Sequence, residues 1–173
     1  CLATVANKNA AETCGVDLTK QITWDSMLED GKKLHAENPD YYYLNTDTKI
    51  LCEYVLRPYL RQMTGESFII DSEKKMSFTR EQLVEVLTYI KDCYDGGVFE
   101  PAEDSATFKG QIHTNPKWMD GKFVFAYGPS SSINLLMDAV PEAECTVVQM
   151  PMAEDRVNDG FFADTPQYMT VNK

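Results

Sequence analysis

Residues 115–140 read NPKWMDGKFVFAYGPSSSINLLMDAV, and this stretch decides the fold class. Residues 115–120 favour a short helical turn that Gly121 stops. The aromatic and β-branched run at residues 122–127 is bounded by glycine at both ends and has the length of a strand. We therefore expect a buried strand at the centre of the protein.

The residues after this strand predict a turn and then a helix. Gly128 and Pro129 indicate a turn, and the three serines at 130–132 offer N-cap oxygens to an apolar helix over residues 133–139. At the carboxyl end of a strand, such a turn directs free backbone amides and the positive end of a helix dipole towards a ligand. Serine-capped turns are also common without a ligand, and on its own the stretch favours that simpler interpretation.

Size and composition bound the class of protein. A chain of 173 residues fits one domain or one lobe of a larger protein, and 43% hydrophobic with 25% charged residues is typical of a folded globular chain. The formal net charge is -11 and no basic stripe is present. Neutralising nucleic-acid phosphates needs clustered Lys and Arg, so a nucleic-acid partner is not expected.

The chain has no apolar run of bilayer length and no signal-peptide pattern. It begins at Cys1, which fits either the lipidated cysteine of a mature bacterial lipoprotein or the cut end of a longer protein. No CxxC spacing occurs, so neither a structural zinc nor a redox pair is expected. A disulfide framework is not expected either, because such frameworks are denser in cysteine and serve smaller domains. Most of the cysteines are predicted to be buried thiols; they are Cys1, Cys14, Cys52, Cys93 and Cys145.

Local signals place the other elements and give an α/β chain, with a small sheet flanked by helices. Thr23 caps a helix that ends near Glu37, and Thr79 with Gln82 forms the capping box of a second long helix. That second helix should bury a stripe of Leu83, Val86, Leu87, Ile90 and Tyr94. The remaining predictions are strands at 1–6, 41–44, 145–150 and 168–171, helices at 7–16 and from Asp47 to Gly65 with a kink at Pro58, a hairpin of 67–70 and 75–78, and loops at 98–110 and 153–160.

Five blocks of sequence stand in a distinctive order and spacing: NKNAAETCGVD (7–17), ITWDSMLEDGKKL (22–34), SFTREQLVEVLTYIKDCYDGGVFEP (77–101), WMDGKFVFAYGPSSS (118–132) and TVVQMPMAED (146–155). Together they resemble the family 1 extracellular solute-binding proteins of bacterial ABC importers. The resemblance implies the C-terminal lobe of a class II periplasmic-binding-protein-like fold. Residues 1–173 would then be a single lobe, excised from a two-lobe protein, and Cys1 would lie inside that parent rather than carry its lipid.

The resemblance also implies a function. The parent would be the substrate-binding component of an ABC importer, non-enzymatic and without cofactor or metal, which captures a sugar or oligosaccharide between two lobes and delivers it to a permease. It would be extracellular, at the cell surface or periplasmic, and it would meet the membrane only through a lipid anchor. Two other classes stay open: a carbohydrate-processing enzyme domain and a stand-alone interaction module.

Ligand contacts are expected at strand ends and helix starts. For Tyr127, ligand contact and core packing are equally favoured, and for Asp47 a helix N-cap is favoured over a sugar contact. The family often has an aromatic residue shortly after the glycine at 128, whereas this chain has Pro129, so contacts there stay open. Trp24 and Trp118 are expected in the core. The candidate ligand-binding residues are Thr46, Asp47, Tyr127, Ser130, Ser131 and Phe161.

No catalytic constellation can be assembled from the sequence. His35 and His113 lack zinc-ligand spacing, and the serines at 130–132 lack the GxSxG setting of a nucleophile elbow. Glu100, Glu103 and Asp104 could in principle form an acid–base pair, but a solvated loop is favoured. We therefore predict no catalytic and no metal-binding residue.

Overall fold

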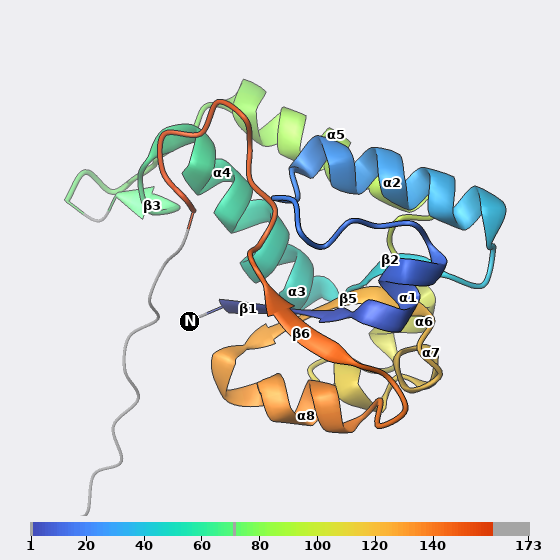
Figure 1. Ribbon diagram of the computed structural model, residues 1–173. Helices are drawn as coiled ribbons and strands as arrows, with labels where there is room; N and C mark the ends of the chain where they lie inside the picture. The colour runs from blue at the N-terminus through green and yellow to red at the C-terminus, as the bar shows by residue number, and fades with distance from the viewer. Residues whose placement is uncertain (1, 71, 161–173) are drawn as a thin grey trace, which may run out of the picture.

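A mixed sheet forms the centre of the protein, and the computed structural model describes residues 2–70 and 72–160 around it (Figure 1). The sheet has four strands in the order β2-β5-β1-β6. β5 runs parallel to β2 and antiparallel to β1, and β1 is antiparallel to β6. The strands are β1 (Leu2–Asn7), β2 (Tyr42–Asn45), β5 (Phe123–Pro129) and β6 (Cys145–Val148). The predicted α/β class is confirmed.

Helices cover both faces of this sheet (Figure 1). α2 (Trp24–Glu37), α4 (Arg57–Thr64) and α5 (Arg80–Asp95) lie on one side, and α8 (Ile133–Asp138) lies on the other. Because β5 is covered from both sides, every residue from Phe123 to Gly128 is buried. This explains why its sequence is a continuous apolar run and not an alternating one.

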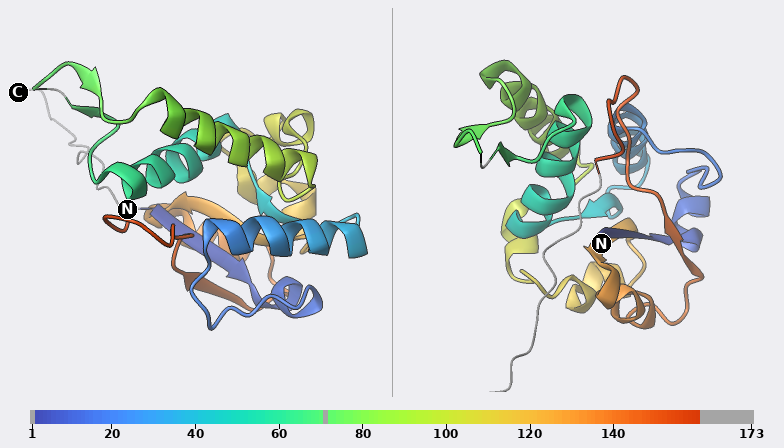
Figure 2. Two further views of the ribbon diagram at one scale, coloured as in Figure 1. Left: turned by 90° about the horizontal axis from the view of Figure 1, so that it is seen from above. Right: turned by 90° about the vertical axis from the view of Figure 1, so that its left-hand side faces the viewer.

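Shorter elements complete the chain, and the small hairpin projects from one end of the molecule (Figure 2). Residues 98–110, predicted as a loop, contain a short helix, and the strand predicted at 168–171 lies outside the described residues. The shorter elements are α1 (Lys8–Thr13), α3 (Thr48–Ile50), a π-helix (Leu51–Leu56), β3 (Ile69–Ile70), β4 (Lys75–Met76), α6 (Ala102–Ala106), α7 (Pro116–Met119) and 3₁₀ turns at Ile112–Thr114 and Ser130–Ser132.

The two long helices begin where their capping residues predict. Thr23 accepts a hydrogen bond from the backbone N–H of Ser26 at 3.0 Å, and Thr79 accepts one from Gln82 at 3.2 Å. In both cases the third residue of the helix returns a side-chain bond to the N-cap backbone. Each reciprocal pair satisfies two backbone donors that a helix start would otherwise leave unpaired.

The kink predicted at Pro58 takes the form of a π-helix. Pro58 has no N–H to donate to the preceding turn, yet the chain stays helical from Thr48 to Thr64. A wider, π-helical turn accommodates the proline. In this turn the N–H of Arg57 bonds to the carbonyl of Cys52, five residues earlier. Gly65, with φ +80°, then ends the helix as predicted.

Two features of the predicted strand–turn–helix are wrong. Gly128 and Pro129 remain in β5, because they pair with Ala3 and Leu2 of β1. The serines then form a 3₁₀ turn, and no serine side chain caps α8. A partner strand from the start of the chain therefore overrides the local turn signal.

The buried stripe of α5 is also rotated from its prediction. Val86 is buried as expected, but Tyr89 and Cys93 complete the buried face, and Leu87 is 48% exposed. The neighbours α2 and α4 decide which residues are covered. Among the described cysteines only Cys93 is fully buried, whereas Cys52 is exposed, so the prediction of mostly buried thiols is wrong.

The segment after β6 passes across α4, and hydrogen bonds to one side chain, Gln62, hold it there. Gln62, which is fully buried, accepts hydrogen bonds from Trp24 Nε1 and from the N–H of Ala153, each at 2.7 Å. Its Nε2 donates to the carbonyl of Pro151 at 2.9 Å. Trp24 and Trp118 are both buried, as predicted.

Candidate functional site

Three strands end at the same edge of the sheet. β2 and β5 are parallel, and β6 points the same way because both β5 and β6 are antiparallel to β1. In open α/β sheets, ligands bind at the edge where strands end in their carboxyl termini. We call this the carboxyl edge and define it as residues 45–47, 127–131 and 148–150.

A hollow of about 200 Å³ opens at the carboxyl edge. The rings of Tyr54 and Tyr127 stack there with centroids 5.8 Å apart and planes 23° apart. Both side chains are almost completely buried, so the pair closes the inner side of the hollow rather than projecting from it. The lining residues are Ala3, Thr4, Tyr54, Tyr127, Val147, Val148, Gln149 and Met150.

Both tyrosines of this pair are neutral at physiological pH. Burial, with smaller contributions from Glu53 and Asp47, raises the pKa of Tyr54 to about 12. Burial also raises the pKa of Tyr127 well above its ordinary value. The Tyr127 hydroxyl has only the sulfur of Met27, at 4.0 Å, as a weak acceptor among the described residues. The two tyrosines thus contribute uncharged aromatic rings to the wall of the hollow.

Thr46 and Asp47 lie directly after β2 and are buried. One carboxylate oxygen of Asp47 accepts from the N–H of Ile50 at 2.8 Å, and the other accepts from the N–H of Gly110 at 2.8 Å. The Thr46 hydroxyl lies 3.3 Å from that of Tyr94. The N-cap interpretation of Asp47 is confirmed, and both residues fix the shape of the carboxyl edge through internal bonds.

The other sequence-predicted site residues are placed differently. Ser130 and Ser131 are exposed at the end of β5, and neither hydroxyl bonds to a residue that the structure describes. Tyr127, three residues earlier, is 3% exposed and belongs to the core as well as to the hollow. Phe161 lies outside the described residues. The carboxyl edge therefore brings together five of the six predicted residues, with two of them open to solvent.

Sequence reasoning missed Asn45, the last residue of β2. It is 1% exposed, and within residues 2–70 and 72–160 neither its Nδ2 nor its Oδ1 finds a hydrogen-bond partner. A buried amide without partners costs roughly 1–3 kcal/mol for each unsatisfied group. Its position in the sequence could have indicated a role at the site, because Asn45 begins the polar run Asn-Thr-Asp at the end of a buried strand. The unsatisfied amide of Asn45 indicates that this part of the carboxyl edge lacks a hydrogen-bonding partner.

The acidic loop near α6 holds an ion-pair network. Lys117 lies between Glu100 and Asp104, with its Nζ 2.9 Å from an oxygen of each. Glu100 is fully buried and also accepts from Asn115 Nδ2 at 2.8 Å. Burial lowers the pKa of Lys117, but the hydrogen bonds and the charge attraction to Glu100 and Asp104 together outweigh it, so the pKa is raised. These charges anchor residues 98–122 and do not form a pair of free carboxyl groups.

Two of the described thiols, Cys93 and Cys14, are protected by burial, and the described ranges contain no cluster of metal ligands. Burial raises the pKa of Cys93 to about 12 and that of Cys14 to about 11, so both thiols stay protonated at neutral pH. His35 contacts the carbonyl of Tyr41 at 2.9 Å through Nδ1. Residues 2–70 and 72–160 contain no group of three or more His, Cys, Asp or Glu that could hold a metal ion.

Solved structures of binding proteins share this architecture. A periplasmic oligogalacturonide-binding protein from Yersinia enterocolitica, in complex with saturated digalacturonic acid, is similar with a TM-score of 0.78 at 23% identity, over 92% of this chain and 40% of that one. A periplasmic solute-binding protein from Pectobacterium atrosepticum gives 0.75 at 19% identity, over 92% of this chain and 41% of that one.

This chain has the fold of one part of a solute-binding protein. The resemblance inferred from the sequence blocks is thus confirmed at the level of the fold, and the chain spans about 40% of the length of the solved structures. A de novo designed cysteine esterase is also similar, with a TM-score of 0.78 at 23% identity, over 92% of this chain and 40% of that one. No protein-family model and no curated protein matched the chain.

Within the described residues, the helices lack the combination of length and apolar character needed to cross a bilayer.

Proposed function

We propose that this chain forms one lobe of the substrate-binding component of an ABC importer. The parent protein captures an extracellular solute, a sugar or an oligosaccharide, in a cleft between two lobes. The chain supplies one wall of that cleft through its carboxyl edge. The protein acts outside the cytoplasmic membrane or in the periplasm, is held there by a lipid anchor of the parent, and delivers its ligand to a permease.

One combined observation supports this proposal: the chain has the architecture of solute-binding proteins, and its carboxyl edge has a composition that suits a sugar. The architecture is that of proteins described as solute-binding, one of which is solved with a digalacturonic acid. The carboxyl edge has the composition that a sugar requires, since it joins aromatic rings to short polar groups. The stacked rings of Tyr54 and Tyr127 offer an apolar surface, and the exposed hydroxyls of Ser130 and Ser131 offer hydrogen bonds.

The residues at the edge take different roles in this proposal. Ser130 and Ser131 contact sugar hydroxyls directly, because their own hydroxyls have no partner in the described chain. Thr46 and Asp47 hold the loop after β2 in place, and Tyr127 forms part of the wall of the hollow. The proposed contact through Phe161 stays a prediction from the sequence.

Binding in such a cleft selects the closed arrangement of the two lobes. A ligand that touches both walls stabilises the closed form by the contacts that the open form lacks. With one wall alone, a large share of those contacts is missing. We therefore expect this chain in isolation to bind the solute far more weakly than the complete protein does.

A thermal-shift screen of the complete protein tests the proposal. The probes are mono- and oligosaccharides, with peptides and polyamines as comparison classes. A saccharide present at one hundred times its Kd stabilises the folded state by about 2.7 kcal/mol and raises the melting temperature. A rise with peptides or polyamines alone contradicts sugar capture. Hydrolysis of an added glycan, followed by chromatography, would instead support the carbohydrate-processing enzyme class.

A further inference from the structure

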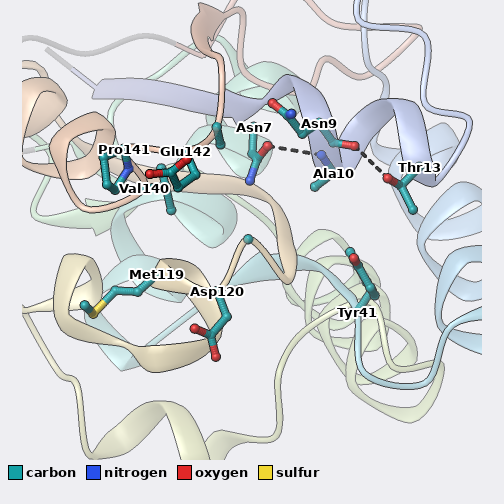
Figure 3. Close-up of a pocket in the computed structure, with 12 residues that line it drawn as sticks. Asn7, Asn9, Ala10, Thr13, Tyr41, Met119, Asp120, Val140, Pro141 and Glu142 are labelled. Carbon is teal, nitrogen blue, oxygen red and sulfur yellow. Dashed lines mark hydrogen bonds between the residues drawn. The ribbon is translucent and has the colours of Figure 1, made fainter.

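A second hollow, of about 390 Å³, lies at the opposite end of β5 from the carboxyl edge (Figure 3). We call it the distal hollow. β5 has seven residues, so the two hollows are separated by about 20 Å along the strand. The distal hollow is lined by Asn7, Asn9, Ala10, Thr13, Tyr41, Met119, Asp120, Gly121, Val140, Pro141, Glu142 and Ala143.

Asn7 is the buried polar group of the distal hollow. It is 1% exposed, and its Oδ1 accepts a hydrogen bond from the N–H of Ala10 at 3.1 Å, which caps α1. That bond fixes the amide orientation, because the oxygen must face the helix and the nitrogen must face away from it. Figure 3 shows the nitrogen directed to the side of Met119 and Asp120, next to Gly121, where an added Cβ would lie 3.3 Å from it. No described residue accepts a hydrogen bond from this nitrogen.

The walls around Asn7 are chemically mixed. Val140, Pro141 and Met119 supply apolar surface, and the half-buried Tyr41 stands on the opposite side (Figure 3). The volume falls in the range of about 300–1,000 Å³ that small-molecule sites occupy. An apolar hollow with a few fixed polar groups is the usual form of such sites.

Charge at the mouth of the distal hollow narrows the class of ligand. Asp120 and Glu142 are exposed carboxylates, and neither forms an ion pair with a described residue. One cation lies close by, since Lys122 Nζ is 4.4 Å from the centroid of the Tyr41 ring, but the two carboxylates outnumber it and disfavour an anion. The Asn7 amide nitrogen needs an acceptor, which an ammonium group does not have. A hydroxyl satisfies both requirements, since it accepts from Asn7 and donates to a carboxylate.

We infer that the distal hollow binds a small neutral polyhydroxylated molecule, of the size of one sugar ring. A ring hydroxyl accepts the hydrogen bond from Asn7 Nδ2 while a neighbouring hydroxyl donates to Asp120 or Glu142. The ring packs against Val140 and Pro141. This site is separate from the carboxyl edge, and its occupancy does not depend on the transport function proposed above.

Side-chain amide NMR on the isotope-labelled complete protein tests this inference. D-glucose, glucosamine and gluconate are titrated separately to high millimolar concentration, and the Asn7 NH₂ signals are followed. We expect D-glucose to shift them in a saturable manner and gluconate to leave them unchanged. If glucosamine alone shifts them, the site takes cations and the inference is wrong. If no probe shifts them, the hollow is not a polyol site.

Two substitutions at Asn7 distinguish the role of its amide nitrogen as a hydrogen-bond donor from the role of its oxygen as the cap of α1. Asn7→Asp keeps the oxygen that caps α1 but removes the amide donor, and Asn7→Ser does the same without adding charge. We expect each to weaken D-glucose binding about tenfold, which corresponds to one well-made hydrogen bond. Because these variants have no Asn7 NH₂ group, ligand-observed NMR measures the change in D-glucose affinity.

Asn134→Asp is the matched control, because Asn134 is exposed on α8 and does not line either hollow. It should leave D-glucose binding unchanged. Binding that survives both Asn7 variants would overturn the inference. Shifts at Val147 and Val148 without shifts at Asn7 would place the sugar at the carboxyl edge and would also contradict it.

Discussion

The indole Nε1 of Trp24 donates a 2.7 Å hydrogen bond to Oε1 of Gln62. The same oxygen accepts from the N–H of Ala153, so one buried amide joins α2 to the segment that follows β6. Ala153 and Trp24 are more than a hundred residues apart in the sequence. This pair of hydrogen bonds therefore holds the return segment against the helical layer.

Replacing Gln62 with leucine should destabilise the fold. Gln62→Leu keeps a similar volume but leaves the donors of Trp24 and Ala153 buried without an acceptor. At roughly 1–3 kcal/mol for each unsatisfied donor, we expect a decrease of about 3 kcal/mol in the free energy of unfolding, measured by urea denaturation. Gln111→Leu, at an exposed position, is the control and should change stability by less than about 0.5 kcal/mol. Equal effects of the two variants would contradict this role of Gln62.

Asn45→Leu should have opposite effects on stability and on binding. The wild-type amide is buried with both polar atoms unpaired among the described residues, so an apolar side chain of the same shape should leave the free energy of unfolding unchanged or raise it. If the amide finds its partner in the closed, ligand-bound form, affinity of the complete protein for its solute falls about tenfold. Urea denaturation and calorimetric titration measure the two quantities. A clear drop in stability would show that Asn45 is satisfied in the folded protein.

Alanine at Ser130 and Ser131 should weaken solute binding without destabilising the chain. Both hydroxyls are exposed and neither caps α8, so the double variant removes no internal hydrogen bond that the structure describes. We expect the Kd of the complete protein to rise about threefold to tenfold for each hydrogen bond to the solute that is removed. Thr88→Ala, on the exposed side of α5, controls for general effects of removing a surface hydroxyl. Unchanged affinity in the double variant would exclude these serines from the solute-binding surface.

Buried tyrosines predict a decline of stability at alkaline pH. Burial raises the pKa of Tyr54 and of Tyr59 from 10.0 to about 12. Between pH 10 and 12 the unfolded chain therefore binds fewer protons than the folded chain, and stability falls as pH rises. Melting temperatures recorded across this window, with tyrosinate absorbance as a second signal, measure the effect.

Tyr59→Phe removes one of these titrating groups and should flatten the alkaline decline. Its hydroxyl forms no hydrogen bond that the structure describes, and the ring can keep its stack on Trp24, at 4.9 Å between centroids. Gln111→Leu serves as the control, because Gln111 is exposed and carries no group that titrates. An identical slope in the wild-type protein and both variants would show that tyrosine burial does not govern the alkaline transition.

Local chemistry predicted the parts of the fold that depend on neighbouring residues. The capping oxygens of Thr23, Thr79 and Asp47 act within three residues, so the sequence located these helix starts correctly. Gly65 ended its helix for an equally local reason, because glycine adopts a positive φ without strain.

Long-range pairing explains what the sequence could not reveal. Gly128 and Pro129 carry a strong turn signal, yet β1 holds them in the sheet. The exposure of Leu87 depends on where α2 and α4 pack against α5. In the candidate site, the unpaired amide of Asn45 and the stacking of Tyr54 on Tyr127 arise from tertiary contacts that no periodicity in the sequence contains.

The place of β1 between β5 and β6 has a consequence for biosynthesis. Leu2 pairs with Pro129 and Asn7 pairs with Cys145, so the partner strands that the structure describes for β1 are synthesised more than a hundred residues after it. Contacts so distant in sequence close slowly, and the apolar strand is exposed to other chains in the meantime. We therefore expect a chaperone to bind nascent chains over this interval.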